Sequence, residues 1–220
     1  MRKIKIDIVA DVVCPWCYIG YARLQRAIKS LESELTIELY WYPFELNPTI
    51  APGGEPLLQY LVRQYQTSEQ ACRELQEHVT QLGFEVGIRF DFDDDMAMYN
   101  TRKAHQLVQW AMQHRCQQAL IERLFHAYFT LHLPIDDEEI LLSMATEVGL
   151  DRQLCEQVLK EPSWSGVVAN IETQWLQAGI QVVPAMIIDE QHLLNGAQSE
   201  EVWVKQLREI AAQPHHSRAH

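Results

Sequence analysis

The sequence predicts an α/β fold in which a strand–helix–strand (βαβ) half and a hairpin–helix (ββα) half flank a large all-helical insertion. Three observations predict it. Strand patterns lie near both ends of the chain, helical periodicity fills the middle, and neither end holds enough elements to bury a sheet alone. The two ends are therefore expected to pack together.

The first half begins with a strand, because apolar and charged residues alternate over 3–8. Apolar residues then recur at helical spacing over 24–31, and alternation over 37–42 predicts a second strand. A segment rich in proline and glycine, 43–56, leads into the insertion.

Helix-capping residues mark the helices expected within the insertion. The expected first and last residues are Ser68 with Gly83, Thr101 with no assigned end, Asp136 or Asp137 with Gly149, and Ser163 with Gly179. No internal repeat separates these helices into similar units, so the insertion is expected to be a single helical bundle.

The last half returns to mixed structure. Residues 185–189 are expected to form a buried strand, 190–191 a turn, 192–195 the partner strand and 200–212 a closing helix. The expected domains are 1–50 together with 180–213, an inserted helical domain over 51–179, and a flexible tail over 214–220.

The stretch Cys14-Pro15-Trp16-Cys17 lies where the first strand gives way to the first helix. A helix N-terminus stabilises a thiolate, which is the nucleophilic form of cysteine, so the motif predicts thiol redox chemistry with Cys14 as the nucleophile. A structural zinc site is disfavoured because the chain has no second Cys-x-x-Cys pair. A permanent disulfide across so small a loop would stabilise the fold little.

Composition narrows the possible partners. The 220 residues are 47% hydrophobic and carry a net charge of −12, which disfavours binding to nucleic acids and anionic membranes. The N-terminus lacks the features of a signal peptide and no apolar run is long enough for a membrane span, so a cytoplasmic location is expected. An odd number of cysteines, five, fits that compartment.

With these features assembled, the sequence resembles the DsbA-like branch of the thioredoxin superfamily. Within that branch it is similar to the FrnE-type group, which is related to 2-hydroxychromene-2-carboxylate isomerases. The segments that carry the resemblance are 11–20 (DVVCPWCYIG), Asn100-Thr101 with Ala104-His105, 179–184, and Gly196-Ala197-Gln198.

The resemblance implies a thioredoxin-like fold for the two halves, in which Cys14 attacks and Cys17 resolves. It also implies a cis Val183-Pro184 bond that faces the dithiol, with the Val183 backbone binding an extended partner. Val182 stands where the group usually has glycine, which affects the shape of the substrate groove.

Residues beside the dithiol are candidates for substrate contact. The candidates are Pro15, Trp16, Val183, Pro184, Asn100 and His105, with Met96, Met98 and Tyr99 at the near edge of the insertion. Asp11 is either a proton relay for Cys17 or a polar residue at a strand end. His105 is either a proton donor or, more commonly for such a residue, a core histidine bonded to backbone. Cys72, Cys116 and Cys155 are expected to be inert helix cysteines among apolar neighbours.

Three classes of function follow. The first is a dithiol–disulfide oxidoreductase acting on protein or peptide thiols, with no bound cofactor and no metal. The second is an isomerase or transferase that uses glutathione as co-substrate on a small aromatic molecule, and the third is a non-catalytic peptide-binding module. The related isomerases have serine at the position of Cys14, so the two cysteines favour redox chemistry. The sequence does not indicate an oligomeric state.

Overall fold

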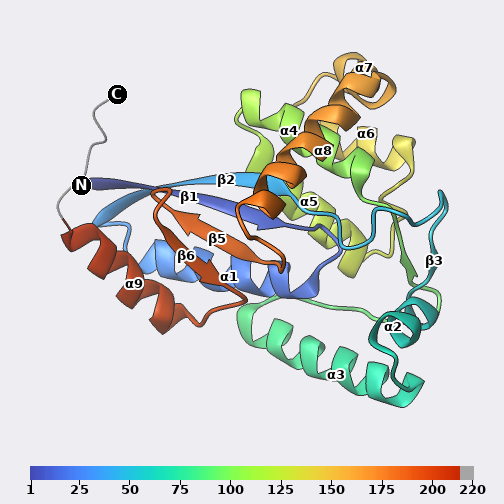
Figure 1. Ribbon diagram of the computed structural model, residues 1–220, viewed down its shortest axis with the longest axis horizontal. Helices are drawn as coiled ribbons and strands as arrows, with labels where there is room; N and C mark the ends of the chain where they lie inside the picture. Colours follow the sequence, from blue (N-terminus) through green and yellow to red (C-terminus); the bar gives the residue numbers. More distant parts are fainter. Residues whose placement is uncertain (214–220) are drawn as a thin grey trace.

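The computed structural model describes residues 1–213, and their arrangement confirms the expected α/β fold. Its central sheet contains β1 (Arg2–Ala10), β2 (Leu35–Pro43), β5 (Ala185–Ile188) and β6 (His192–Asn195), in the order β2-β1-β5-β6 (Figure 1). β1 pairs in parallel with β2 and antiparallel with β5, which pairs antiparallel with β6. The two ends of the chain thus share one sheet, while the tail predicted at 214–220 lies outside the described residues.

Helices cover the sheet on two sides. α1 (Pro15–Ser30) and α9 (Glu200–Ala212) pack together on one face, where the alternating isoleucines of β1 are buried. On the other side α4 (Arg102–Gln113) and α8 (Pro162–Gln177) contact β2 (Figure 1). α5 (Gln117–Phe129) also contacts β2 but lies beside α1, because its Phe125 ring stacks on Tyr18 of α1 with the ring centroids 4.6 Å apart. The period-two pattern of β1 and the helical pattern that follows it therefore produce one layered core.

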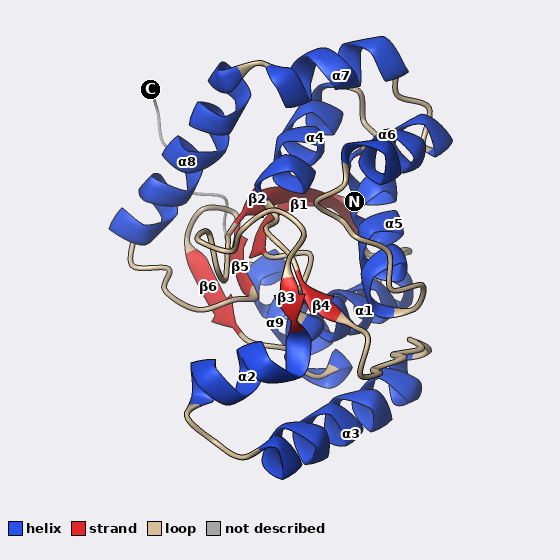
Figure 2. Cartoon of the chain, turned by 90° about the vertical axis from the view of Figure 1, so that its right-hand side faces the viewer, coloured by secondary structure: helices blue, strands red, loops and turns tan. Residues whose placement is uncertain are grey.

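The remaining elements belong to the insertion. They are β3 (Glu55–Pro56), α2 (Leu57–Tyr65), α3 (Glu69–Val86), β4 (Ala97–Met98), α6 (Glu138–Glu147) and α7 (Arg152–Lys160). α2 contacts α3, and α3 also contacts α1, so this helical pair lies below the short β3–β4 ladder and beside the first helix (Figure 2). The sequence did not predict this ladder, because each of its strands is only two residues long.

Several predicted helix caps are confirmed. The Ser68 hydroxyl accepts a hydrogen bond from the Ala71 N–H at 3.2 Å, and the Asp137 carboxylate accepts one from the Ile140 N–H at 3.1 Å. Side-chain oxygens thus satisfy N–H groups that have no partner within the first turn.

Gly83 was expected to end α3, but the helix continues to Val86 and is capped by Gly87 at φ +84°. A side-chain carbon at Gly83 would overlap the ring of Phe90. Gly83 therefore provides close packing within the helix, and Gly87 provides the left-handed conformation at its end.

Ser163 was expected to begin α8, but it lies inside the first turn. Glu161 is the N-cap residue and Pro162 occupies the first helical position, where the fixed φ of proline suits a helix and its missing N–H costs nothing. The same Glu161 also closes α7, so one residue separates the two helices.

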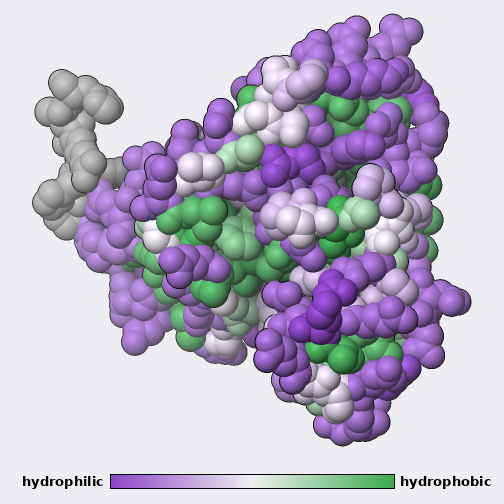
Figure 3. Space-filling view, turned by 45° about the vertical axis from the view of Figure 1, so that its right-hand side comes forward, coloured by the Kyte–Doolittle hydropathy of each residue, from purple (hydrophilic) through white to green (hydrophobic). Residues whose placement is uncertain are grey.

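The outer faces of the helices are mostly hydrophilic, and apolar surface gathers in the middle of the face shown in Figure 3. No helix within residues 1–213 combines the length and the hydropathy needed to cross a membrane.

Candidate active site

The dithiol lies at the junction of β1 and α1. Cys14 is the N-cap residue of α1, with extended backbone angles, and Pro15 occupies the first helical position. The Cys14 N–H donates to the Asp11 carbonyl at 3.1 Å, and its carbonyl accepts from the Cys17 N–H at 3.1 Å. These bonds place Cys14 at the N-terminus of α1, where the unpaired backbone N–H groups form the positive end of the helix dipole.

The two thiols differ in their surroundings. Both are free and buried, with exposed fractions of 4% for Cys14 and 1% for Cys17. Burial raises the pKa of the Cys17 thiol well above its ordinary value, and its contact with Cys14 raises it further. Cys17 therefore holds its proton strongly, whereas Cys14 lies on the wall of a cavity.

A cavity of about 200 Å³ opens beside Cys14. Its walls come from the Val13–Trp16 turn, from α2 and α3, from Phe92 and Met98, from the end of α5, and from Val183. The predicted contacts Pro15 and Trp16 thus line the same cavity as Cys14, together with Met98 from the near edge of the insertion. Asn100 and His105 are not among the residues that line it.

The Val183-Pro184 peptide bond is cis, as the resemblance implied. Val183 lines the cavity with Cys14, whereas the Val182 side chain is 60% exposed and outside it. The bulk of Val182 therefore does not narrow this cavity. A direct contact between Pro184 and Cys14 stays a prediction.

Gly20 lets this segment approach α1. A side-chain carbon at Gly20 would lie 3.3 Å from Pro184 Cγ and 3.2 Å from Ala197 Cα. The Gly196 N–H also donates to the Pro184 carbonyl at 2.8 Å. Three separated segments of the sequence are thus held together at one point beside the dithiol turn.

Asp11 and His105 form a buried pair behind the dithiol, each about 1% exposed. His105 Nε2 lies 3.3 Å from Asp11 Oδ1 and 3.2 Å from the Phe44 carbonyl oxygen, and Asp11 Oδ2 accepts from the Leu46 N–H at 2.7 Å. Burial acts to lower the pKa of His105, but the hydrogen bond and negative charge of Asp11 outweigh it and raise the pKa. The negative charge of Asp11 also acts to raise the pKa of Cys17.

A second ionic group, which the sequence did not reveal, lies next to this pair. Arg102 Nε donates to Glu45 Oε1 at 2.9 Å, and an Arg102 Nη2 lies 3.4 Å from Glu172 Oε2. Glu172 in turn accepts from the Glu45 N–H at 2.7 Å. Because the three residues are distant in sequence, no spacing pattern could have identified them. They join α4 and α8 to the loop that follows β2.

The Asn100 side chain makes two hydrogen bonds to the backbone of neighbouring segments. Its side-chain oxygen accepts from the Arg102 N–H at 3.0 Å, and its Nδ2 donates to the Pro48 carbonyl at 3.0 Å. Thr101 is the N-cap residue of α4, but its side chain makes no capping bond. Asn100 therefore provides the hydrogen-bond acceptor for a backbone N–H in the first turn of α4 and ties this turn to the 43–56 segment.

The other cysteines lie away from the cavity lining. Cys72 on α3 and Cys155 on α7 are buried, and burial raises the pKa of Cys155 to about 11. The prediction that all three lie within helices is wrong for Cys116, which precedes α5 and whose Sγ lies 3.2 Å from the His114 carbonyl oxygen. Within residues 1–213, no three His, Cys, Asp or Glu side chains are grouped to hold a metal ion.

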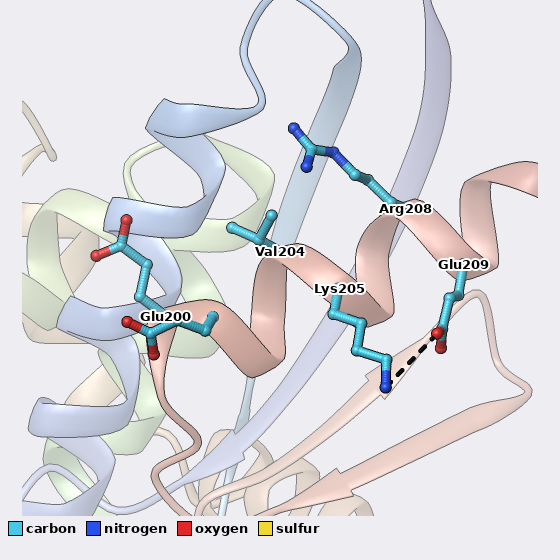
Figure 4. A pocket seen from close by; sticks show the side chains of 6 residues that line it. Glu200, Val204, Lys205, Arg208 and Glu209 are labelled. Atoms are coloured by element: carbon cyan, nitrogen blue, oxygen red, sulfur yellow. Dashed lines mark ion pairs between the residues drawn. The ribbon is translucent and has the colours of Figure 1, made fainter.

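A separate hollow lies along α9 (Figure 4). Only residues of this one helix, from Glu200 to Glu209, line it. Three of its charged side chains are paired: Lys205 Nζ lies 3.9 Å from Glu209 Oε1, and Arg208 Nη2 lies 2.7 Å from Glu34 Oε1. It has no opposing wall and no reactive side chain, so the cavity at Cys14 is the better candidate site.

Known proteins share this architecture. A probable DsbA oxidoreductase from Streptomyces coelicolor superposes with a TM-score of 0.89 at 24% identity, covering 99% of this chain and 94% of that one. A 2-hydroxychromene-2-carboxylate isomerase superposes with a TM-score of 0.71 at 16% identity, covering 94% and 96%. The uncharacterized protein YwbO of Bacillus subtilis (strain 168) is 28% identical over 207 residues, which span 92% of this chain and 94% of YwbO.

The fold defines the class, which is that of thioredoxin-fold proteins. Residues 5–208 match the model of one family within it. The chain belongs to the DSBA-like thioredoxin domain family.

Proposed function

We propose that this protein is a thiol–disulfide oxidoreductase in which Cys14 attacks and Cys17 resolves. The observation that carries the proposal is the contrast between the thiols: Cys14 borders the cavity at the start of α1, and Cys17 is buried one turn further in with a raised pKa. A substrate sulfur that enters the cavity meets Cys14 first.

In the reductive direction, the Cys14 thiolate attacks a substrate disulfide, forms a mixed disulfide and releases one substrate thiolate. Cys17 then loses its proton and attacks the Cys14 sulfur, which releases the second substrate thiolate and leaves a Cys14–Cys17 disulfide. Two electrons pass from the dithiol to the substrate. The reverse sequence oxidises a substrate dithiol.

Asp11 is the proposed proton relay for Cys17. The negative charge of Asp11 acts to raise the pKa of Cys17, and its carboxylate is held in place by the Leu46 N–H and by His105. The raised pKa of His105 lets the pair share a proton within the buried site. His105 is therefore a positioning residue that acts through Asp11.

Substrate contact is assigned to Pro15, Trp16, Val183 and Pro184, on the basis of the cavity lining and the packing of Pro184 near Gly20. The proposed substrates are protein or peptide thiols and disulfides, with residues 1–50 and 180–213 as the catalytic domain. The proposal includes a cytoplasmic location, because the cysteines outside the motif are free thiols, the state that a reducing compartment maintains.

A redox titration tests the proposal. The reduced protein is equilibrated in dithiothreitol and glutathione buffers of graded potential, quenched with acid and weighed by mass spectrometry. We expect the wild-type protein to lose two hydrogens reversibly as the disulfide forms. The Cys72→Ser variant should show the same change in mass, and the Cys14→Ser variant should not. A dithiol that does not interconvert reversibly over the range of known thioredoxin-fold potentials, about −270 to −120 mV, would contradict the proposal.

A further inference from the structure

The cavity beside Cys14 has an unusual lining for a site on a protein with a net charge of −12. None of its lining residues is Asp, Glu, Lys, Arg or His. Burial raises the pKa of Tyr60 and of Tyr128, so both phenols stay neutral. Burial likewise raises the pKa of Tyr65, and the other polar side chains of the wall are the amides of Gln64 and Gln76. The wall around Cys14 therefore offers no charged group to a ligand.

We propose that this cavity selects substrates in which an uncharged, apolar side chain neighbours the reacting sulfur, and that it discriminates against glutathione. The inference rests on the proposed function, since it names the substrate class for the same dithiol. Glutathione carries two carboxylates and one ammonium per molecule. The wall has no charged side chain to pair with these groups, and moving charges out of water without such partners is costly.

The size of the cavity supports a single side chain as its occupant. Pockets that hold drug-sized ligands enclose about 300–1,000 Å³, whereas this one encloses about 200 Å³. An aromatic or branched aliphatic side chain next to the substrate cysteine fits that scale, while a whole glutathione molecule does not.

The outer wall of the cavity belongs to the α2–α3 pair (Figure 2). Val79 of α3 is buried in this wall, whereas Leu75, one turn earlier, is 37% exposed. Leu75 therefore borders the entrance, where it contacts solvent on one side and the cavity on the other. We assign it as a specificity residue, and a charge at this position is expected to change which substrates enter.

Rates of the first exchange step test the proposal. Reduced protein is mixed with the symmetric disulfides of N-acetyl-Phe-Cys-amide and N-acetyl-Ser-Cys-amide, and with glutathione disulfide. Oxidation of the dithiol is followed by acid quenching and mass spectrometry. Each rate is divided by the rate of the same disulfide with free dithiothreitol, which removes differences in intrinsic reactivity.

We expect the phenylalanine disulfide to react about tenfold faster than the serine disulfide, and glutathione disulfide to react most slowly. The Leu75→Lys variant should lose most of the preference for phenylalanine and react faster with glutathione disulfide. Phe84→Lys is the matched control. Phe84 lies on the same helix, is 77% exposed and does not line the cavity, so this substitution adds the same charge as Leu75→Lys but outside the cavity.

Normalised rates within about twofold for all three disulfides would overturn the inference while leaving the proposed function intact. Equal behaviour of Leu75→Lys and Phe84→Lys would overturn the role of Leu75. A wild-type protein that reacts with none of the disulfides would instead refute the proposed function. The wild-type comparison decides the inference even if Leu75→Lys does not fold, which circular dichroism would reveal.

Discussion

Replacing His105 with glutamine should remove a pH-dependent part of the stability. The folded-state pKa of His105 is raised above its ordinary value of 6.5, because the hydrogen bond and charge of Asp11 outweigh the effect of burial. Because the pKa of His105 is higher in the folded protein than in the unfolded chain, its pairing with Asp11 stabilises the fold fully at pH values below the unfolded-state pKa. This contribution is lost as the pH rises through the folded pKa. The wild-type free energy of unfolding should therefore fall as the pH rises above about 6.5.

The size of the effect follows from what the substitution leaves behind. Removing one partner of a buried ion pair typically costs about 3–5 kcal/mol, because the other charge stays buried. Asp11 retains its hydrogen bond from the Leu46 N–H. We therefore expect the lower end, about 3 kcal/mol, for His105→Gln at pH 6.

Urea unfolding between pH 6 and pH 9 measures both quantities. Glu45 and Glu172 are the other carboxylates whose negative charge acts to raise the pKa of His105. His126→Gln is the matched control, since His126 lies on α5 and is exposed. Parallel stability profiles for the wild type and His105→Gln would refute the assignment of a stabilising charged pair.

Two further substitutions test the packing around the site. Arg102→Met should destabilise the fold by about 3–5 kcal/mol in urea unfolding, because the buried carboxylate of Glu45 and the partly buried carboxylate of Glu172 lose their cation. Arg152→Met, at an exposed ion pair, should change stability little. Gly20→Val should cost about 1–3 kcal/mol through crowding against Pro184 and should also slow disulfide exchange, measured with a small chromogenic disulfide.

Gly166→Val is the control for the last substitution, because no atom lies within 4 Å of a side-chain carbon at Gly166. Exchange rates that are equal for Gly20→Val and Gly166→Val would show that the Pro184 segment does not need its close approach to α1. Similar stability losses for the two arginine variants would contradict the difference in burial assigned to them.

Local signals predicted the reactive part of the site. Cys14 and Cys17 are three residues apart and lie at a boundary between strand and helix, so spacing and periodicity alone placed both at the start of α1. The cis bond before Pro184 was different, because no local pattern distinguishes it from a trans bond, and the prediction came from the resemblance.

The environment of the dithiol was not predictable in the same way. Leu75 and Val79 are four residues apart on α3, a spacing that favours one buried face, yet Leu75 is partly exposed at the cavity entrance. Periodicity identifies the apolar face of a helix, but it does not show how far the neighbouring elements extend to cover that face. Likewise, Glu45 and Arg102 meet only because α4 packs beside the loop after β2, and a separation of 57 residues carries no sequence signal.

Trapping of the first exchange intermediate tests the central claim most directly. Reduced Cys17→Ser and Cys14→Ser variants are each mixed with one symmetric peptide disulfide, quenched with acid, digested and examined by mass spectrometry. The account predicts that Cys17→Ser accumulates one peptide adduct, located on Cys14, whereas Cys14→Ser acquires none on Cys17 in the same time. An adduct that forms on Cys17 as fast as on Cys14 would contradict the account.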